Sequence, residues 1–110
     1  HRVWVVEATL KPGKRHIYAK RTFYLDEDSW TALAADSYDA NGRLYRASFA
    51  HMSPSYDTST PNAETQVFYD LTSGVYNVSF LMGPYDGIHY TATQPATQWS
   101  PDALAGAGVR

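Results

Sequence analysis

The chain has 110 residues, of which 44% are apolar, 15% aromatic and 18% charged. This length corresponds to one domain, able to bury roughly two-thirds of the surface that its unfolded form exposes. Nine Lys and Arg against eleven Asp and Glu give a net charge of −2, a balance without the overall basic field that nucleic acid or anionic lipid attracts. The sequence has no cysteine, which excludes disulfides, thiolate metal sites and thiol catalysis.

The beginning of the sequence predicts that the chain is part of a longer protein. It starts His1-Arg2-Val3, without an initiator Met or a signal-peptide pattern. No apolar run approaches the ~18 residues that a membrane-spanning helix needs.

Aromatic and β-branched residues occur in short runs between turn residues, a pattern typical of strands. The runs predict six strands, roughly at 2–10, 15–25, 30–38, 43–52, 64–71 and 75–82. The links at 11–14 and 39–42 have the Pro-Gly and Asn-Gly chemistry of tight turns. Strands joined by such short links are antiparallel neighbours, so we expect a meander.

Two segments lack this alternation of strand-like runs and turn residues. Residues 53–63 and 83–98 predict long loops, the second with a short strand at 88–91. Ser100-Pro101-Asp102 predicts the start of one short helix, because Ser caps helices and Pro is favoured in the first turn. The expected fold is therefore mainly β, with a sheet over 2–82 and a loop and helix over 83–110.

Strand register predicts a largely apolar face with alanines at its centre. We pair Trp4 with Arg21 through the first turn, Leu25 with Trp30, and Asp36 with Arg46 through the turn at 39–42. The candidate ligand-binding residues on this face are Trp4, Val6, Ile17, Phe23, Trp30, Ala34 and Met52.

Three charged residues, Arg21, Asp36 and Arg46, share the predicted apolar face. In one interpretation they are structural: Asp36 and Arg46 form a cross-strand ion pair and Arg21 lies over the Trp4 ring. In the other, Arg21 or Arg46 meets the head group of an amphiphile whose tail lies along the alanines. The residues alone leave both interpretations open.

Known catalytic and metal-binding patterns do not occur in the sequence. The histidines (His1, His16, His51 and His89) have no metal-ligand spacing, and no Gly-x-Ser-x-Gly motif is present. We therefore expect no catalytic residues, no metal, no cofactor and no nucleic-acid partner, and a protein that is not an enzyme.

The sequence resembles a proteobacterial family of domain-of-unknown-function proteins, usually labelled outer-membrane-lipoprotein-sorting-like. The resemblance lies in residues 2–30, in 38–46, and in the ending 100–104 with Gly108 and Arg110. Members of the family are several times longer and secreted, so the resemblance implies that residues 1–110 are one C-terminal fragment. The related lipoprotein-sorting carrier and receptor have a curved antiparallel sheet around an apolar cavity for acyl chains. The resemblance therefore implies a half-barrel-like sheet and a place in the periplasm or at the periplasmic face of the outer membrane. One departure is Ala105-Gly106-Ala107, where relatives often carry a basic run.

Two functions follow as expectations. The first is a non-enzymatic carrier module for lipids, lipoprotein acyl chains or other hydrophobic molecules of the bacterial envelope. The second is a structural or docking segment that packs on the missing N-terminal part or on an export-system or outer-membrane partner. In either case exposed sheet edges predict self-association of the fragment.

Overall fold

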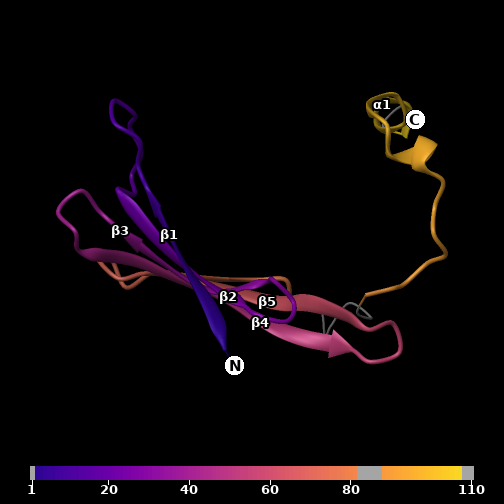
Figure 1. Cartoon of the computed structure of the whole chain (residues 1–110), viewed down its shortest axis with the longest axis horizontal. Helices are drawn as coiled ribbons and strands as arrows, with labels where there is room; N and C mark the ends of the chain where they lie inside the picture. Colours follow the sequence, from indigo (N-terminus) through magenta and orange to yellow (C-terminus); the bar gives the residue numbers. More distant parts are fainter. Residues whose placement is uncertain (1, 82–87, 108–110) are drawn as a thin grey trace.

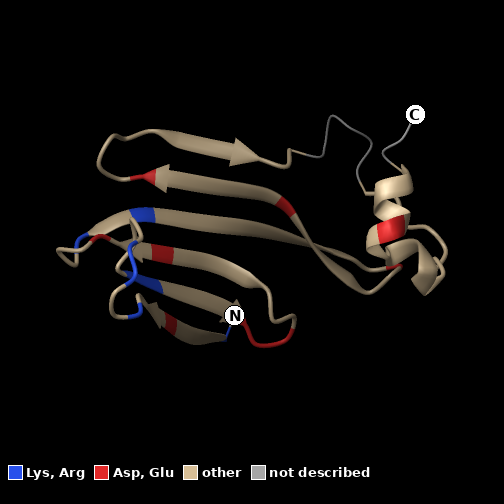
Figure 2. Ribbon diagram, turned by 90° about the horizontal axis from the view of Figure 1, so that it is seen from above, with Lys and Arg blue, Asp and Glu red and all other residues tan. Residues whose placement is uncertain are grey.

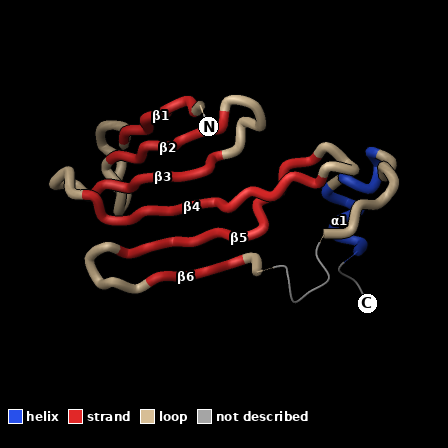
Figure 3. The backbone as a smooth tube through the Cα atoms, turned by 90° about the horizontal axis from the view of Figure 1, so that it is seen from below, coloured by secondary structure: helices blue, strands red, loops and turns tan. Residues whose placement is uncertain are grey.

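The computed structural model describes residues 2–81 and 88–107. Its strands form one sheet in the order β1-β2-β3-β4-β5-β6, every neighbouring pair antiparallel, which confirms the predicted open meander (Figures 1 and 3). The strands are β1 (Val3–Thr9), β2 (Lys20–Asp26), β3 (Ala32–Tyr38), β4 (Leu44–Ser55), β5 (Thr60–Asp70) and β6 (Tyr76–Ser79).

A short 3-10 helix, η2 (Ala96–Trp99), precedes the helix α1 (Pro101–Ala107). The predicted cap of α1 is confirmed, because the Ser100 Oγ accepts the backbone N–H of Ala103 at 3.2 Å. Among the described elements α1 contacts only η2, and it lies away from the sheet (Figure 1).

The structure differs from the sequence prediction at three segments. Residues 53–63 are not a long loop: β4 and β5 run through them as a hairpin with its turn at 56–59. The second strand begins at Lys20 and not at residue 15, because residues 10–19 form a connecting loop. No strand occurs at 88–91, where the hydroxyl of Tyr90 bonds to Ser55 and Asn62 of the hairpin. Residue 82, the predicted end of the last strand, lies outside the described residues.

The predicted register is wrong between β2 and β3. Phe23 pairs with Ala35 and Tyr24 with Ala34, and a bulge follows at Tyr24/Leu25. The connection 27–31 moves the partner of Leu25 from Trp30 to Ala32, an even shift that changes no face. Asp26 caps this connection by accepting the N–H and hydroxyl of Ser29, and Trp30 adopts a left-handed φ of 59°. Because side chains alternate along a strand, the one-residue step at the bulge then moves Ala34 and Asp36 to the other face.

A second bulge, at Ser37/Tyr38, changes the register between β3 and β4. Arg46 therefore pairs with Ser37, and the predicted Asp36–Arg46 ion pair is wrong. Between β1 and β2 the register differs by four residues, with Trp4 opposite Leu25. That even shift leaves every side chain on the face predicted for it.

The pairings define two faces of the sheet. The arginine face carries Trp4, Val6, Ala8, Arg21, Phe23, Ala35, Ser37, Arg46, Ser48, Ala50, Gln66, Phe68, Asp70, Asn77 and Ser79. The tyrosine face carries Val3, Val5, Glu7, Thr22, Tyr24, Ala34, Asp36, Ala47, Phe49, Val67, Tyr69, Tyr76 and Val78.

The sheet is a single layer. The accessible surface is 8919 Å², against about 6,100 Å² for a compact monomer of this mass. The radius of gyration is 18.0 Å, against about 13 Å for a compact domain of similar length. Val67 is the one buried hydrophobic residue among those described, at 7% exposure. Both faces of the sheet therefore keep apolar side chains at the surface.

Val67 supplies the first testable prediction. Val67→Ala removes two buried methyl groups from the centre of the sheet and should cost about 1–2 kcal/mol in the free energy of unfolding. Val75→Ala is the matched control, because Val75 is 65% exposed in the β5–β6 turn. Urea unfolding followed by tryptophan fluorescence measures both, and equal losses would contradict the placement of the core.

Candidate binding groove on the arginine face

Two adjoining pockets form a groove along the arginine face. The polar pocket, of about 420 Å³, is lined by Tyr18, Arg46, Asp70, Ser73 and Asn77 among others. The apolar pocket, of about 180 Å³, is lined mainly by Phe23, Ala32, Ala35, Ala50 and Gln66. Ser48 and Phe68 border both pockets, which makes the groove continuous.

Small side chains open the apolar pocket. Ala35, Ser48 and Ala50 occupy the centre of the arginine face on β3 and β4, while Phe23 and Phe68 stand on the flanking strands. Alanine and serine leave the space above the central strands unfilled between the two phenylalanines. The alanine-rich centre predicted from the sequence therefore exists, although on β3 the residue that faces it is Ala35.

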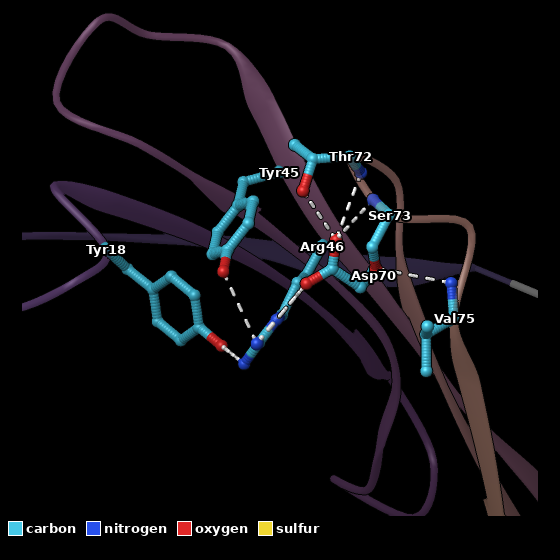
Figure 4. Close-up of polar contacts among 7 residues, drawn as sticks. All are labelled: Tyr18, Tyr45, Arg46, Asp70, Thr72, Ser73 and Val75. Carbon is cyan, nitrogen blue, oxygen red and sulfur yellow. Dashed lines mark hydrogen bonds and ion pairs between the residues drawn. The ribbon is translucent and has the colours of Figure 1, made fainter.

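Tyr18 brings the two arginines of this face together. It belongs to the loop 10–19, which is anchored to the sheet because Leu10 N–H donates to the Ala19 carbonyl and Ala19 N–H to the Tyr38 carbonyl, both at 2.9 Å. The Arg46 Nη1 donates to the Tyr18 hydroxyl at 2.8 Å (Figure 4). The Arg21 guanidinium carbon lies 4.3 Å from the centre of the same ring, in cation–π geometry.

Asp70 completes the cluster on the side of β5. Its Oδ2 lies 3.4 Å from both Nε and Nη2 of Arg46. Its Oδ1 accepts the Thr72 hydroxyl at 2.7 Å and the backbone N–H groups of Thr72 and Ser73 at 3.0 Å each (Figure 4). These bonds, the Thr72 hydroxyl first, lower the pKa of Asp70 well below its usual range. The bond to Tyr18 raises the pKa of Arg46.

The charges of the cluster do not balance. Arg21 and Arg46 contribute two positive charges, and Asp70 is the one carboxylate that lines the groove among the described residues. Among the residues that the structure describes, no carboxylate forms an ion pair with Arg21. One end of the groove is therefore cationic and rich in hydrogen-bond donors, while the other is apolar.

The residues predicted as a site from the sequence are partly separated. Trp4, Val6 and Phe23 lie on the arginine face, and Trp4 stacks on Trp30 with ring centres 6.3 Å apart. Ile17 is 61% exposed in the loop 10–19, and Met52 lies beyond a bulge at His51/Met52 in the β4–β5 hairpin. Ala34 borders the apolar pocket, but its register position is on the tyrosine face.

The predicted polar cluster is divided between the two faces. Arg21 and Arg46 meet around Tyr18, and Arg21 does not lie over Trp4 as its structural interpretation proposed. Asp36 is on the tyrosine face, where it accepts the Tyr24 hydroxyl at 2.9 Å and raises the pKa of Tyr24.

Sequence reasoning missed Tyr18 and Asp70. Tyr18 falls within the predicted strand 15–25, whereas the structure places it in the loop 10–19. Asp70 could have been predicted, because it directly precedes the turn Leu71-Thr72-Ser73-Gly74, and an Asp in that position commonly accepts the N–H groups of the turn. Among residues 2–81 and 88–107 no three His, Asp or Glu side chains are grouped to hold a metal ion. Within the same ranges no helix has the length and apolar character to span a bilayer.

The structure defines the fold class of this protein as an open antiparallel meander with a groove on one face. The chain belongs to the family described as "Protein of unknown function (DUF1329)", whose profile matches residues 1–105. It is 46% identical, over its whole length, to the uncharacterized protein PA3922 of Pseudomonas aeruginosa.

Two solved structures share the fold. One is a putative outer membrane lipoprotein-sorting protein domain from Vibrio parahaemolyticus, with a TM-score of 0.56 and 18% identity. The other is a DUF1329 family protein from Desulfovibrio piger, with a TM-score of 0.57 and 18% identity. Each likeness extends over 93% of this chain. It extends over 41% of the Vibrio chain and 40% of the Desulfovibrio chain. The chain spans 24% of the length of the Pseudomonas relative.

The lowered pKa of Asp70 predicts a pH-dependent contribution to stability. The folded state binds this proton less tightly than the unfolded chain, so ionised Asp70 stabilises the fold above its ordinary pKa of 3.8. This contribution is lost as the pH falls below that value. Asp70→Asn keeps an acceptor for the turn but removes the charge.

The expected result is a lower urea midpoint for Asp70→Asn at about pH 7 and a difference from wild type that narrows progressively as the pH falls from about 4 to about 2. Asp102→Asn, on α1 away from the sheet, is the control and should match wild type throughout. A difference that stays constant across this pH range would contradict the ionised state of Asp70.

Proposed function

We propose that this chain is a non-enzymatic binding module for an anionic, lipid-like amphiphile of the Gram-negative envelope. The observation that carries the proposal is the continuous groove of the arginine face, apolar at one end and cationic at the other. An acyl chain would lie over the alanines of the apolar pocket, and the acidic head group would meet Arg46 and Arg21.

The apolar end provides the driving force. Phe68 borders both pockets and is 44% exposed, so a bound acyl chain would remove its ring from water. Each Å² of apolar surface removed from water contributes about 25 cal/mol. Ala35 and Ala50, which line the same pocket, give the acyl chain room without requiring a side chain to move.

The cationic end provides orientation. A guanidinium binds carboxylate or phosphate through paired N–H donors. Arg46 is fixed by Tyr18 and Asp70, so little side-chain freedom remains to be lost on binding. Arg21 adds a positive charge that no described carboxylate offsets.

The composition of the groove favours binding over catalysis. None of the described residues that line it is a histidine, and its carboxylate, Asp70, is held ionised by the turn at 72–73. A carboxylate with a strongly lowered pKa is a poor general acid or base at neutral pH.

The fold comparisons support a location in the bacterial envelope. The Vibrio structure is described as a putative outer membrane lipoprotein-sorting protein domain, and this chain, which shares its fold, has a groove suited to acyl chains. We extend that description to this chain as part of the proposal, with the periplasm or the periplasmic face of the outer membrane as its location.

Two neighbouring residues on β4 test the groove. Ser48 borders both pockets, whereas Ala47 lies on the tyrosine face. Ser48→Trp should fill the groove and weaken binding of a fluorescent fatty acid at least about tenfold, which corresponds to roughly 1.4 kcal/mol. Ala47→Trp, the matched control, should change the dissociation constant less than about twofold.

The head group is tested with the same probe as its uncharged methyl ester. Arg46→Gln should weaken the acid and leave the ester unchanged, because only the acid carries the charge that Arg46 pairs with. Failure of the wild-type chain to bind either probe at micromolar concentration would overturn the proposal. Equal effects of Ser48→Trp and Ala47→Trp would overturn the assignment to the arginine face.

A second candidate is a docking segment that packs on the rest of a longer protein. The tyrosine face favours it, because Phe49, Tyr69 and Tyr76 form a row of ring contacts with centres 6.2 Å apart while Tyr76 stays 67% exposed. Val78 lies on the same face and lines neither pocket, so a photo-crosslinker there in the full-length protein would trap protein and never lipid if this function is correct. We also predict that the chain self-associates through the exposed edges of β1 and β6, which light scattering would detect as a mass above that of the monomer.

A further inference from the structure

The even charge balance of the sequence hides a separation in space. Of the eight Lys and Arg that the structure describes, seven lie at one end of the sheet (Figure 2). We call this the basic end; it consists of Lys11, Lys14, Arg15, Lys20, Arg21, Arg43 and Arg46. The opposite end carries Asp26, Glu27, Asp28, Asp57 and Glu64, with Arg2 as its one described cation.

Five of the seven cations at the basic end form no ion pair with a carboxylate that the structure describes. Four acidic residues also lie at this end, and each is engaged: Glu7 with Lys20, Asp70 with Arg46, Asp36 with the Tyr24 hydroxyl, and Asp39 with N–H groups of its own turn. No ion pair among residues 2–81 and 88–107 involves the remaining cations, Lys11, Lys14, Arg15, Arg21 and Arg43.

The loop 10–19 combines these cations with exposed apolar side chains. Lys11-Pro12-Gly13-Lys14 forms a tight turn at its tip, closed by a 3.1 Å bond from Lys14 N–H to the Lys11 carbonyl, with Gly13 at a φ of 75°. Lys11, Lys14 and Arg15 are all exposed, as are Leu10 and Ile17 beside them. Basic residues next to exposed aliphatic ones suit the headgroup boundary of a bilayer, where the cations meet phosphates and the aliphatic groups meet acyl chains.

We propose that the basic end docks on the surface of an anionic phospholipid membrane through the loop 10–19, with Arg43 beside it. The same loop carries Tyr18, which lines the polar pocket of the groove, so docking places the cationic end of the groove at the bilayer surface. This interaction goes beyond the proposed ligand binding and does not depend on it.

The acidic end does not cancel the attraction. At about 0.1 M salt the Debye length is about 10 Å, whereas the seven residues of β2 separate the two ends by about 23 Å at roughly 3.3 Å per residue. A membrane beneath the basic end therefore meets the local positive charge and not the net charge of −2. A soluble polyanion would meet the same cations but would gain nothing from Leu10 and Ile17.

Vesicle co-sedimentation of the 110-residue chain tests the proposal. The chain should bind vesicles of phosphatidylglycerol and phosphatidylcholine in equal parts, and should bind phosphatidylcholine alone much more weakly. Because one basic residue near such a surface contributes roughly a fivefold gain in affinity, Lys11→Gln with Lys14→Gln should weaken binding about 25-fold.

The control double variant, Tyr56→Glu with Thr58→Glu, makes the same change in net charge at the other end of the sheet and should bind as wild type. Ile17→Ser should weaken vesicle binding while leaving binding to soluble polyglutamate unchanged.

Three results would overturn the proposal: equal binding to both vesicle types, equal losses in the two double variants, or a wild-type chain that binds polyglutamate but no vesicles. Fatty-acid binding is measured without vesicles, so a failure here leaves the groove proposal standing.

Discussion

Two β-bulges set the register of β3 and, with it, the composition of both faces of the sheet. The bulge at Tyr24/Leu25 places Ala35 and Ser37 beside Phe23 and Arg21, and the bulge at Ser37/Tyr38 places Arg46 opposite Ser37. A one-residue slip at either position would exchange the two faces across the rest of the sheet. In a single-layer sheet this register also decides which side chains meet in a groove, because no described second layer supplies other contacts.

The cationic end of the groove depends on that register and on one loop. In the observed pairing Arg46 lies on the same face as Arg21, and the loop 10–19 brings Tyr18 between them. Asp70 holds Arg46 from the neighbouring strand and is itself held by its turn. Each member restricts the next, so the positive charge is fixed at the end of an apolar channel. Such an arrangement suits a ligand with one acidic and one aliphatic end.

The sequence predicted the strand order and the capped helix because turn residues and side-chain alternation are local signals. The register could not be predicted from the sequence. Trp30 takes a left-handed φ that nothing in its type favours, and the bulge at Tyr24/Leu25 places Ala34 and Asp36 on the other face. The hairpin over 53–63 was also missed, because Pro54 and Pro61 are unfavourable in strands and are tolerated here as a facing pair. Arg21 and Arg46 were predicted on one face and lie there, but their partners Tyr18 and Asp70 come from a loop and a turn whose placement is a tertiary property.

Intermolecular NOEs between alanine methyl groups and a bound fatty acid test the central claim most directly, because alanines lie on both faces and NOEs are short-range. Ala35 and Ala50 are on the arginine face and line the apolar pocket, whereas Ala47 is on the tyrosine face and lines neither pocket. Binding in the groove predicts NOEs from the acyl chain to the methyl groups of Ala35 and Ala50 and none to that of Ala47. Equal NOEs to all three methyl groups, or NOEs to Ala47 alone, would contradict it.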